Sequence, residues 1–354
     1  MGKILMKGNE AVGAAAIAAG IDSYFAYPIT PQNEISEYLS RELPKSGKAF
    51  LQAESEIAAI NMVYGASASG VRAMTSSSGP GIALMQEGIS YCAGSELPCV
   101  ILNMMRGGPG LGSILPAQAD YFQATKGGGN GDYRNLVYAP SNVQELFDLV
   151  VLAFDKADQY RNPVIVLADG VIGQMMEPVD VDKELRTEKY EKQWALTGTY
   201  GRRDKNIISS FRLQAEDMEK HNKHLLSKYK EMLKNEKQYE TLGVEDADIV
   251  ITGYGSSYRI CKSAKELLEA KDIKVGLIRP ITLWPFPDEA YANITSKCKF
   301  ILDVEMNFSQ MVDDIKVATN CKLPIFHYGR YGGVIPSEEE IVEEVERIIR
   351  EEIK

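Results

Sequence analysis

The chain has 354 residues, of which 45% are hydrophobic and 25% are charged. This is the composition of a globular protein, and the length is enough for two or three domains with hydrophobic cores, which excludes a mainly disordered chain. The formal net charge is −10 and the sequence shows no concentrated basic patch, so a nucleic-acid partner is not expected.

No membrane partner is expected either. No run approaches the roughly 18 consecutive apolar residues that a membrane helix needs, and residues 1–7 lack the long apolar region of a signal peptide. We therefore expect a cytoplasmic protein.

Residues 1 to about 180 alternate between helical and strand patterns, which is typical of a parallel β-sheet with helices on both faces. The expected strands are residues 24–27, 49–52, 73–76, 98–105, 136–138 and 164–168. The expected helices are residues 9–19, one opening at Thr30 and Pro31, one marked by Ile57, Ile60, Val63 and Ser67, residues 82–91 after a turn at 79–81, and residues 143–158.

The middle of the chain changes to charged and polar residues and predicts a linker with a helical arm. A long helix is expected between Arg212 and Glu240. Its apolar positions follow helical spacing, so we expect them to pack on a neighbouring domain or subunit. These positions are Met218, Leu225, Tyr229 and Met232.

The last part of the chain predicts a second α/β unit. The expected strands are residues 248–252, 275–278 and 300–304, and a helix is expected at 257–270. Ser337 followed by Glu340 forms a capping box, which predicts the start of a final helix.

Neither the cysteines nor the histidines predict a metal site in this chain. An iron–sulfur cluster normally needs three or four thiolates at short spacing, whereas the cysteines here are scattered and are interpreted as buried or idle thiols. His221 and His224 lie in a polar helical segment and are interpreted as a surface pair. The cysteines are Cys92, Cys99, Cys261, Cys298 and Cys321.

Thr30, in the segment Tyr27-Pro28-Ile29-Thr30-Pro31, is a candidate anion-binding residue. It would cap a helix whose first residue is proline, a common arrangement. The free N–H groups and the hydroxyl of such a helix start suit a small anion. A plain helix cap explains Thr30 equally well.

Glu54 and Glu56 lie at the junction of a strand and an apolar helix. Acidic residues favour the first turn of any helix because of the helix dipole. The carboxyl ends of parallel strands are, however, where α/β proteins bind ligands. A carboxylate there would be placed to hold a proton for exchange.

Arg106 opens a glycine-rich loop, Gly107 to Gly112, directly after an expected central strand. Glycines let the backbone approach a ligand, and a guanidinium at a strand end suits a carboxylate. The loop lacks the G-x-G-x-x-G spacing of a dinucleotide site, so a nicotinamide enzyme is a weak alternative.

Together these motifs resemble the alpha (pyrimidine-domain) subunits of 2-oxoacid:ferredoxin oxidoreductases. The likeness covers essentially the whole chain, through Tyr27 to Pro31, Gln52 to Ala59, the Arg106 loop and Ile278 to Pro285. Within the family it is strongest to the enzymes that act on 2-oxoisovalerate (3-methyl-2-oxobutanoate), through residues 31–34, 52–56 and 123–129.

The resemblance implies the fold and the domain boundaries. Residues 1–180 would form a thiamine diphosphate pyrimidine-type domain with a parallel sheet and helices on both faces. Residues 181–243 would form the linker and helical arm, and residues 244–354 a transketolase C-terminal-like α/β domain.

The resemblance also implies residue roles. In the family a glutamate at the position of Glu56 bonds N1′ of the thiamine aminopyrimidine and thereby promotes loss of the C2 proton. Glu54 is the alternative. Thr30 and Arg106 would hold the substrate carboxylate, and Pro28 and Ile29 would lie against the cofactor.

Part of the cofactor site is expected on other chains. The diphosphate half of a thiamine site carries G-D-G and, roughly 25 to 30 residues later, an asparagine that holds magnesium. Ala168-Asp169-Gly170 is only a near match. Mg²⁺ and iron–sulfur clusters are therefore expected on partner subunits. The expected partners are a beta (diphosphate-binding), a gamma and a ferredoxin-like subunit, in a dimer of hetero-oligomers.

The implied reaction is oxidative decarboxylation of a 2-oxoacid, with coenzyme A as co-substrate and ferredoxin as electron acceptor. Its products are an acyl-CoA and carbon dioxide. The alternatives are the same reaction with 2-oxoglutarate or pyruvate, and a non-catalytic assembly subunit. Only a scaffold would tolerate replacement of Glu56.

Overall fold

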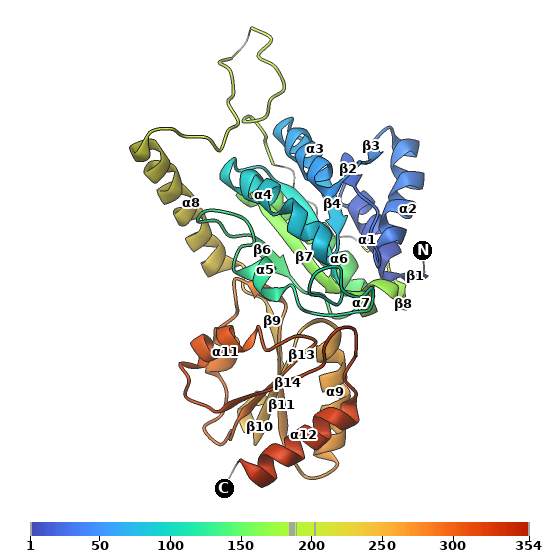
Figure 1. The fold of residues 1–354 in the computed structure, drawn as a ribbon, viewed down its shortest axis with the longest axis vertical. Coiled ribbons are helices and arrows are strands. Elements are labelled where there is room, and N and C mark those ends of the chain that lie inside the picture. Colours follow the sequence, from blue (N-terminus) through green and yellow to red (C-terminus); the bar gives the residue numbers. More distant parts are fainter. Residues whose placement is uncertain (1, 184–187, 189, 202, 353–354) are drawn as a thin grey trace.

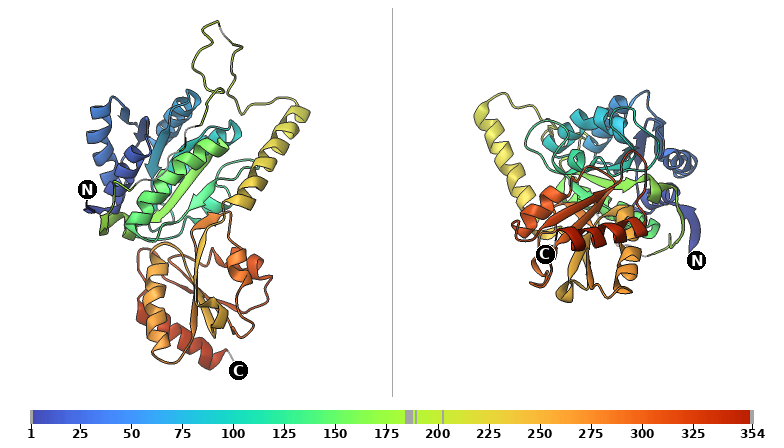
Figure 2. Two further views of the ribbon diagram at one scale, coloured as in Figure 1. Left: turned by 180° about the vertical axis from the view of Figure 1, so that it is seen from behind. Right: turned by 60° about the horizontal axis from the view of Figure 1, so that its bottom comes forward.

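The computed structural model describes residues 2–183, 188, 190–201 and 203–352. Two α/β units lie one above the other, with a long helix beside the upper unit (Figures 1 and 2). The upper unit is built on a seven-stranded sheet of order β12-β6-β7-β5-β4-β2-β3, and the lower unit on a five-stranded sheet of order β14-β13-β10-β11-β9.

The central strands of the first sheet are buried on both faces. Every residue of β5 and β7 is buried, and the two strands pair in parallel over their whole length. The parallel strands are β2 (Ser23–Ala26), β3 (Ala49–Gln52), β4 (Ala73–Ser77), β5 (Cys99–Met105), β6 (Leu136–Tyr138) and β7 (Pro163–Asp169). Only helices on both sides can bury such strands.

Helices α3 and α4 cover one face of this sheet, and α1 and α6 cover the other (Figures 1 and 2). The helices of this unit are α1 (Gly8–Ala18), α2 (Asn33–Glu42), α3 (Glu56–Ala68), α4 (Gly79–Gly94), α5 (Tyr121–Thr125), α6 (Val143–Tyr160), α7 (Gly170–Gln174) and the 3-10 helix η1 (Leu43–Ser46). The predicted α/β class, with a parallel sheet and helices on both faces, is confirmed.

The second sheet has its own core of buried aliphatic and aromatic residues beneath α9 and α12. Its strands are β9 (Tyr239–Leu242), β10 (Ile249–Thr252), β11 (Val275–Pro280), β13 (Ile301–Glu305) and β14 (Ile325–Gly329). Its helices are α9 (Gly255–Glu269), α10 (Glu289–Ala292), α11 (Val312–Thr319), α12 (Glu338–Glu351) and η2 (Val244–Asp246). The capping box of Ser337 and Glu340 opens α12 as predicted.

The sequence did not predict five strands, which are β1, β8, β9, β12 and β14. β1 (Ile4–Lys7) pairs antiparallel with β8 (Met176–Val179), and β12 (Thr282–Trp284) pairs antiparallel with β6. β12 follows β11 in the chain but belongs to the sheet of the upper unit. The second unit therefore completes the first sheet.

Helix α8 (Ala215–Asn235) lies beside the upper unit. Leu225, Tyr229 and Met232 are buried as predicted, whereas Met218 is 37% exposed. The surface interpretation of His221 was wrong, because its ring is buried and Nε2 lies 2.7 Å from the carbonyl oxygen of Gly94. Among the described residues, no helix combines the length and the apolar character that crossing a bilayer requires.

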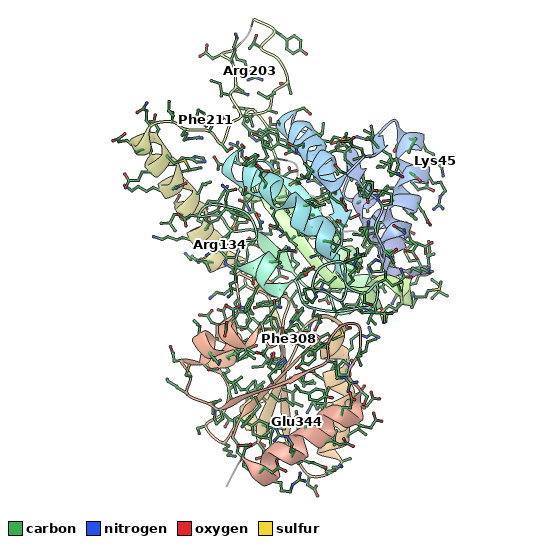
Figure 3. All side chains as sticks on the ribbon, in the orientation of Figure 1. Lys45, Arg134, Arg203, Phe211, Phe308 and Glu344 are labelled. Atoms are coloured by element: carbon green, nitrogen blue, oxygen red, sulfur yellow. The ribbon has the colours of Figure 1, made fainter. Side chains whose placement is uncertain are left out.

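The segment before α8 projects away from both sheets (Figures 1 and 3). It carries large apolar side chains that stand in solvent, among them Phe211, which is 76% exposed. Arg203, on the same segment, donates to the carbonyl oxygen of Ala195 over 3.0 Å. This hydrogen bond links residues 195 and 203 within the segment.

Three further local predictions were wrong. No helix opens at Thr30, because α2 begins only at Asn33. The carbonyl oxygen of Pro31 instead accepts hydrogen bonds from the side chains of Asn9 (2.7 Å) and Gln174 (2.9 Å). Ile57 is 51% exposed and faces away from the core side of α3. The expected turn at 79–81 is the first turn of α4.

Arg279 fastens the lower unit to the upper one. Its side chain is 5% exposed, and its two terminal nitrogens donate to Glu145 at the start of α6 over 2.6 and 2.8 Å. Ser141 accepts a further hydrogen bond over 2.7 Å. Burial acts to raise the pKa of the Glu145 carboxyl, but the hydrogen bonds and the charge of Arg279, together with the hydrogen bonds from Ser141, outweigh it and hold this pKa below its ordinary value.

Replacing Arg279 by Met should destabilise the protein strongly. The change keeps an apolar stem but leaves the half-buried Glu145 carboxylate without its cation, which costs on the order of 3 kcal/mol. The midpoint of urea unfolding should fall accordingly. Arg347→Met is the matched control, since Arg347 forms surface ion pairs on α12 and its loss should change the midpoint little. Equal midpoints for the two variants would contradict the prediction.

Candidate active site

The candidate site lies at the carboxyl edge of the first sheet. Because β2, β3, β4, β5 and β7 are parallel, the loops that follow them meet at one edge, where α/β proteins place ligands. The ends of these strands and the segments that follow them carry Thr30, Glu56, Ser77, Arg106 and Asp169 respectively.

Glu56 is the first residue of α3, and the preceding Ser55 caps the helix by accepting from the backbone N–H of Ala58 over 3.1 Å. Its side chain is buried, with 7% exposed, whereas Glu54 is exposed. Within the described part of the chain, no group forms a hydrogen bond or an ion pair with the Glu56 carboxylate. A buried carboxylate without a partner is costly, so this position calls for a donor from outside the chain.

The first turn of α4 lies directly against this carboxylate. A Cβ on Gly81 would stand 2.6 Å from Glu56 Oε1 and 2.1 Å from Ser77 Oγ. Glycine is therefore required here, because the backbone approaches both side chains too closely for any other residue. The hydroxyls of Ser77 and Ser78 are buried without a partner in the described residues.

Beneath these groups runs a chain of buried hydrogen bonds. Ser76 donates to Gln32 over 2.5 Å and lies 2.6 Å from the hydroxyl of Tyr24, which lies 3.0 Å from Ser36 Oγ. Burial raises the pKa of Tyr24 to about 12. This network holds the loop after β2 against β4.

Arg106 lies at the end of β5, and its side chain is buried with 7% exposed. Its terminal nitrogens donate to the carbonyl oxygens of Thr30 and Leu111, each over 3.0 Å. Its Nε atom is buried and has no partner in the described residues. A Cβ on Gly79 would lie 3.7 Å from Arg106 Cγ, so Arg106 and Glu56 flank the same first turn of α4.

The structure thus brings Thr30 to Arg106, and Glu56 to the start of α4. Pro28 is exposed and Ile29 is half-buried on the loop after β2, and their role toward a cofactor stays a prediction. The N-terminus of α4 is therefore surrounded by the unpartnered Glu56 carboxylate, the unpartnered Nε–H of Arg106 and the hydroxyls of Ser77 and Ser78. These groups can receive a ligand that has both hydrogen-bond donors and an anionic group.

Asp169, at the end of β7, is fully committed to the protein. Its Oδ1 accepts from the backbone N–H groups of Val171 and Ile172, and its Oδ2 accepts from the backbone and the hydroxyl of Ser256 over 3.0 and 2.9 Å. Burial raises the pKa of this carboxyl despite these bonds. The near match to G-D-G is therefore a contact between the two units.

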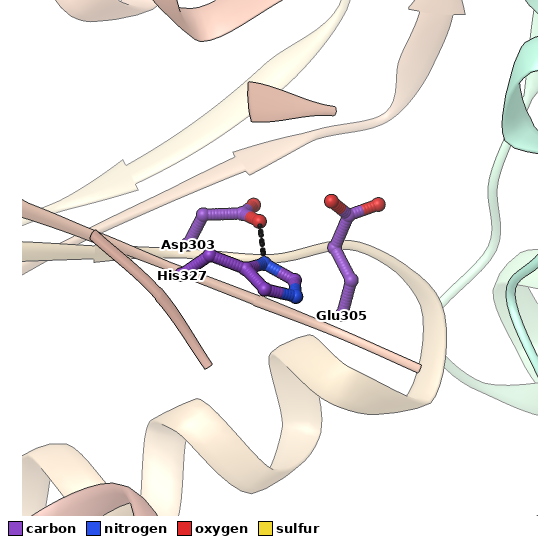
Figure 4. Close-up of side chains that lie close together, drawn as sticks. All are labelled: Asp303, Glu305 and His327. Atoms are coloured by element: carbon purple, nitrogen blue, oxygen red, sulfur yellow. Dashed lines mark hydrogen bonds and ion pairs between the residues drawn. The ribbon is translucent and has the colours of Figure 1, made fainter. Parts of the chain in front are cut away.

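The sequence did not predict a second polar cluster, which lies in the lower unit. Asp303 and Glu305 on β13 and His327 on β14 place side-chain atoms within 4.8 Å of one another (Figure 4). His327 Nδ1 lies 2.7 Å from Asp303 Oδ2, and Nε2 lies 3.1 Å from the carbonyl oxygen of Asn307. Because the carbonyl oxygen of Asn307 can only accept, His327 Nε2 carries a proton. If the ring is neutral, Nδ1 carries none and accepts a hydrogen bond from a protonated Asp303 carboxyl.

The pKa directions agree with such a neutral pair. Burial raises the pKa of Asp303 to about 7 and lowers the pKa of His327. Burial and the nearby Asp303 raise the pKa of Glu305 well above its ordinary value. The oxygens of Glu305 accept from the Met311 N–H over 2.9 Å and from Asn307 Nδ2 over 2.6 Å. The contacts of Glu305 order the loop after β13, whereas Asp303 Oδ1 is buried without a hydrogen-bond partner in the described residues.

Two family models match the chain. One, described as "Pyruvate flavodoxin/ferredoxin oxidoreductase, thiamine diP-bdg", covers residues 14–241, and the other, "Pyruvate:ferredoxin oxidoreductase core domain II", covers residues 247–341. The chain belongs to the 2-oxoacid:ferredoxin oxidoreductase family. The recognition made from the sequence motifs is confirmed, and the family assignment identifies an enzyme subunit with a thiamine diphosphate-binding domain.

Curated relatives span the whole chain. The "Ketoisovalerate oxidoreductase subunit VorB" of Methanothermobacter marburgensis is 49% identical over 98% of this chain and 98% of its own length. The "2-oxoglutarate synthase subunit KorA" of Archaeoglobus fulgidus is 38% identical over 96% of this chain and 98% of its own. Both are named as subunits, so family members work with other chains.

Solved structures support the same fold. A 2-oxoglutarate:ferredoxin oxidoreductase from Magnetococcus marinus, with 2-oxoglutarate, coenzyme A and succinyl-CoA bound, superposes with a TM-score of 0.87 and 32% identity. The match covers 98% of this chain and 65% of that one. A split-gene transketolase, described as an inactive beta4 tetramer, reaches a TM-score of 0.61 at 12% identity and covers 98% of both chains, which supports the fold alone.

Proposed function

We propose that this chain supplies the aminopyrimidine half of a thiamine diphosphate site in a complex that oxidatively decarboxylates 2-oxoisovalerate. The observation that carries the proposal is the buried, unpartnered carboxylate of Glu56 at the carboxyl edge of the sheet. The relatives named for ketoisovalerate support the substrate, since their identity exceeds that of the 2-oxoglutarate subunit.

The residues present fit the aminopyrimidine. Thiamine diphosphate, when bound, supplies a carbon acid whose deprotonated form attacks the 2-oxo carbon. Glu56 would share a proton with N1′, which would provide its buried carboxylate with a donor. Pro28 and Ile29 would lie against the cofactor on the loop after β2.

The substrate carboxylate would bind between Thr30 and Arg106. The free Nε–H of Arg106 and the N-terminus of α4 supply positive potential at this edge. Charge-assisted hydrogen bonds of this kind favour a carboxylate over a neutral ligand.

The rest of the site would come from other chains. The contacts of Asp169 with Ser256 and α7 leave no oxygen of this acid for magnesium. We assign Mg²⁺ and the diphosphate contacts to a beta subunit, and the iron–sulfur clusters to the beta and ferredoxin-like subunits. A gamma subunit would complete the hetero-oligomer, and two such hetero-oligomers would form a dimer. The complex would transfer its electrons to ferredoxin, and coenzyme A would accept the acyl group.

Ferredoxin reduction by the purified complex tests the function. We expect coenzyme A-dependent reduction with 2-oxoisovalerate at a kcat/KM at least about tenfold above those for 2-oxoglutarate and pyruvate, which corresponds to roughly 1.4 kcal/mol. The chain purified alone should show none. Preference for one of the other two acids would correct the substrate, and activity of the chain alone would overturn the shared site.

A further inference from the structure

Gln118 is a fully buried residue that joins the loop of the candidate site to the lower unit. Its Oε1 accepts from the backbone N–H of Met306 over 3.0 Å and from the hydroxyl of Ser257 over 2.8 Å. Its Nε2 donates to the carbonyl oxygen of Tyr254 over 2.8 Å and to Asp169 over 3.4 Å. Both ends of this amide are therefore used across the boundary between the units.

The backbone of Gln118 is held by the same surface. Its N–H donates to the carbonyl oxygen of Met306 over 3.0 Å. Its own carbonyl oxygen accepts from Asn307 Nδ2 over 2.8 Å and from the hydroxyl of Tyr254 over 3.0 Å. Since Asn307 Nδ2 also donates to Glu305, this acid of β13 orders the surface that receives Gln118.

The loop that Gln118 closes places Arg106. Arg106 forms an antiparallel bridge with Pro116, two residues before Gln118. Within the loop, the Gly107 N–H donates to the carbonyl oxygen of Leu115 over 2.9 Å, and the carbonyl oxygen of Leu111 accepts from the guanidinium over 3.0 Å. The backbone and the side chain of Arg106 therefore both rest on the loop whose far end is Gln118.

A second contact pins the same loop to the lower unit. A Cβ on Gly107 would lie 2.9 Å from the carbonyl carbon of Gly332, and a Cβ on Gly333 would lie 2.4 Å from the side-chain Cβ of Leu115. The Gly107 and Gly332 backbones, and the Gly333 backbone and the Leu115 side chain, therefore approach too closely to leave room for a larger residue. The loop is thus seated on the lower unit at two places, with Gln118 making the polar one.

We propose that Gln118 is a positioning residue for the substrate: by fixing the loop on the lower unit, it sets the guanidinium of Arg106 toward the 2-oxoacid carboxylate. The inference rests on the proposed role of Arg106. It assigns the lower unit a part in substrate binding. Neither Gln118 nor the lower unit needs to touch the substrate for this effect, because a small displacement of a binding group weakens binding steeply.

Gln118→Met in the assembled complex tests the proposal, because it keeps the length of the side chain and removes all its hydrogen bonds. The KM for the 2-oxoacid should rise roughly tenfold, while the KM for coenzyme A and the rate of C2 proton exchange of bound thiamine diphosphate stay unchanged. Ser257→Ala removes a single bond to Oε1 and should give a smaller rise with the fold intact, which keeps the test valid if the first variant does not fold.

The double variant separates this inference from the function on which it rests. If Arg106→Ala alone raises the KM for the 2-oxoacid, adding Gln118→Met should raise it no further, since the two residues act through one contact. An unchanged KM in Gln118→Met and Ser257→Ala, beside a raised KM in Arg106→Ala, would overturn the role of Gln118. An unchanged KM in Arg106→Ala would overturn the role of Arg106 itself.

Discussion

Glu56→Gln should slow the exchange of the C2 proton of bound thiamine diphosphate by at least about a hundredfold, within the range of general acid–base effects. Glutamine has the same size and can still hydrogen-bond, but it cannot share a proton with N1′. Cofactor binding should survive, because most of its contacts are expected on the partner subunit. The measurement is proton-to-deuterium exchange at C2 in the assembled complex, followed by NMR after acid quench.

Glu54→Gln is the matched control for this experiment. Glu54 lies two residues earlier, but its side chain is exposed, whereas that of Glu56 is buried beside Gly81. Exchange in the Glu54 variant should equal that of the wild type. Slow exchange only in the Glu54 variant would transfer the role to that residue. Normal exchange in both variants would leave the chain without a catalytic carboxylate and would favour a scaffold.

Arg106→Ala should raise the KM for the 2-oxoacid by about ten- to a hundredfold, because the loss of a charge-assisted hydrogen bond costs on the order of 1.5 to 3 kcal/mol. The KM for coenzyme A should change little. Steady-state ferredoxin reduction by the assembled complex, with each substrate varied in turn, measures both constants.

Arg41→Ala serves as the control, since Arg41 is an exposed cation on α2 that pairs with its neighbour Glu42. It should leave both constants unchanged. An Arg106 variant with an unchanged KM for the 2-oxoacid would return this residue to a structural role, in which it ties the loop after β2 to the glycine loop through the carbonyl oxygens of Thr30 and Leu111.

The part of the fold that local patterns encode was predictable. Continuous apolar strands such as β5 and β7 can be buried only between two layers of helices, and their sequences show this directly. The strands β1, β8 and β12 are only three or four residues long. They exist because a distant partner strand is present, and no local pattern encodes such pairing.

The candidate site was predictable to a similar extent. Parallel strands bring Glu56 and Arg106 to one edge, which the order of strands and helices already implied. The start of α2 was missed, because the side chains of Asn9 and Gln174, far away in the sequence, hold the carbonyl oxygen of Pro31. That Asp303 and Glu305 lie on one face of a strand could have been predicted, since residues two apart on a strand share a face. Their contact with His327 depends on the fold and could not.

The pairing of β12 with β6 bears on how the chain folds. Val137 on β6 meets Trp284 on β12, almost 150 residues later in the sequence, and such distant pairing slows folding. Until the chain beyond Trp284 has been synthesised, β6 remains an edge strand with unpaired backbone groups, which other chains can join. A fragment that ends at residue 180 or 243 would keep that edge permanently, so the upper unit should aggregate when it is expressed without the lower one.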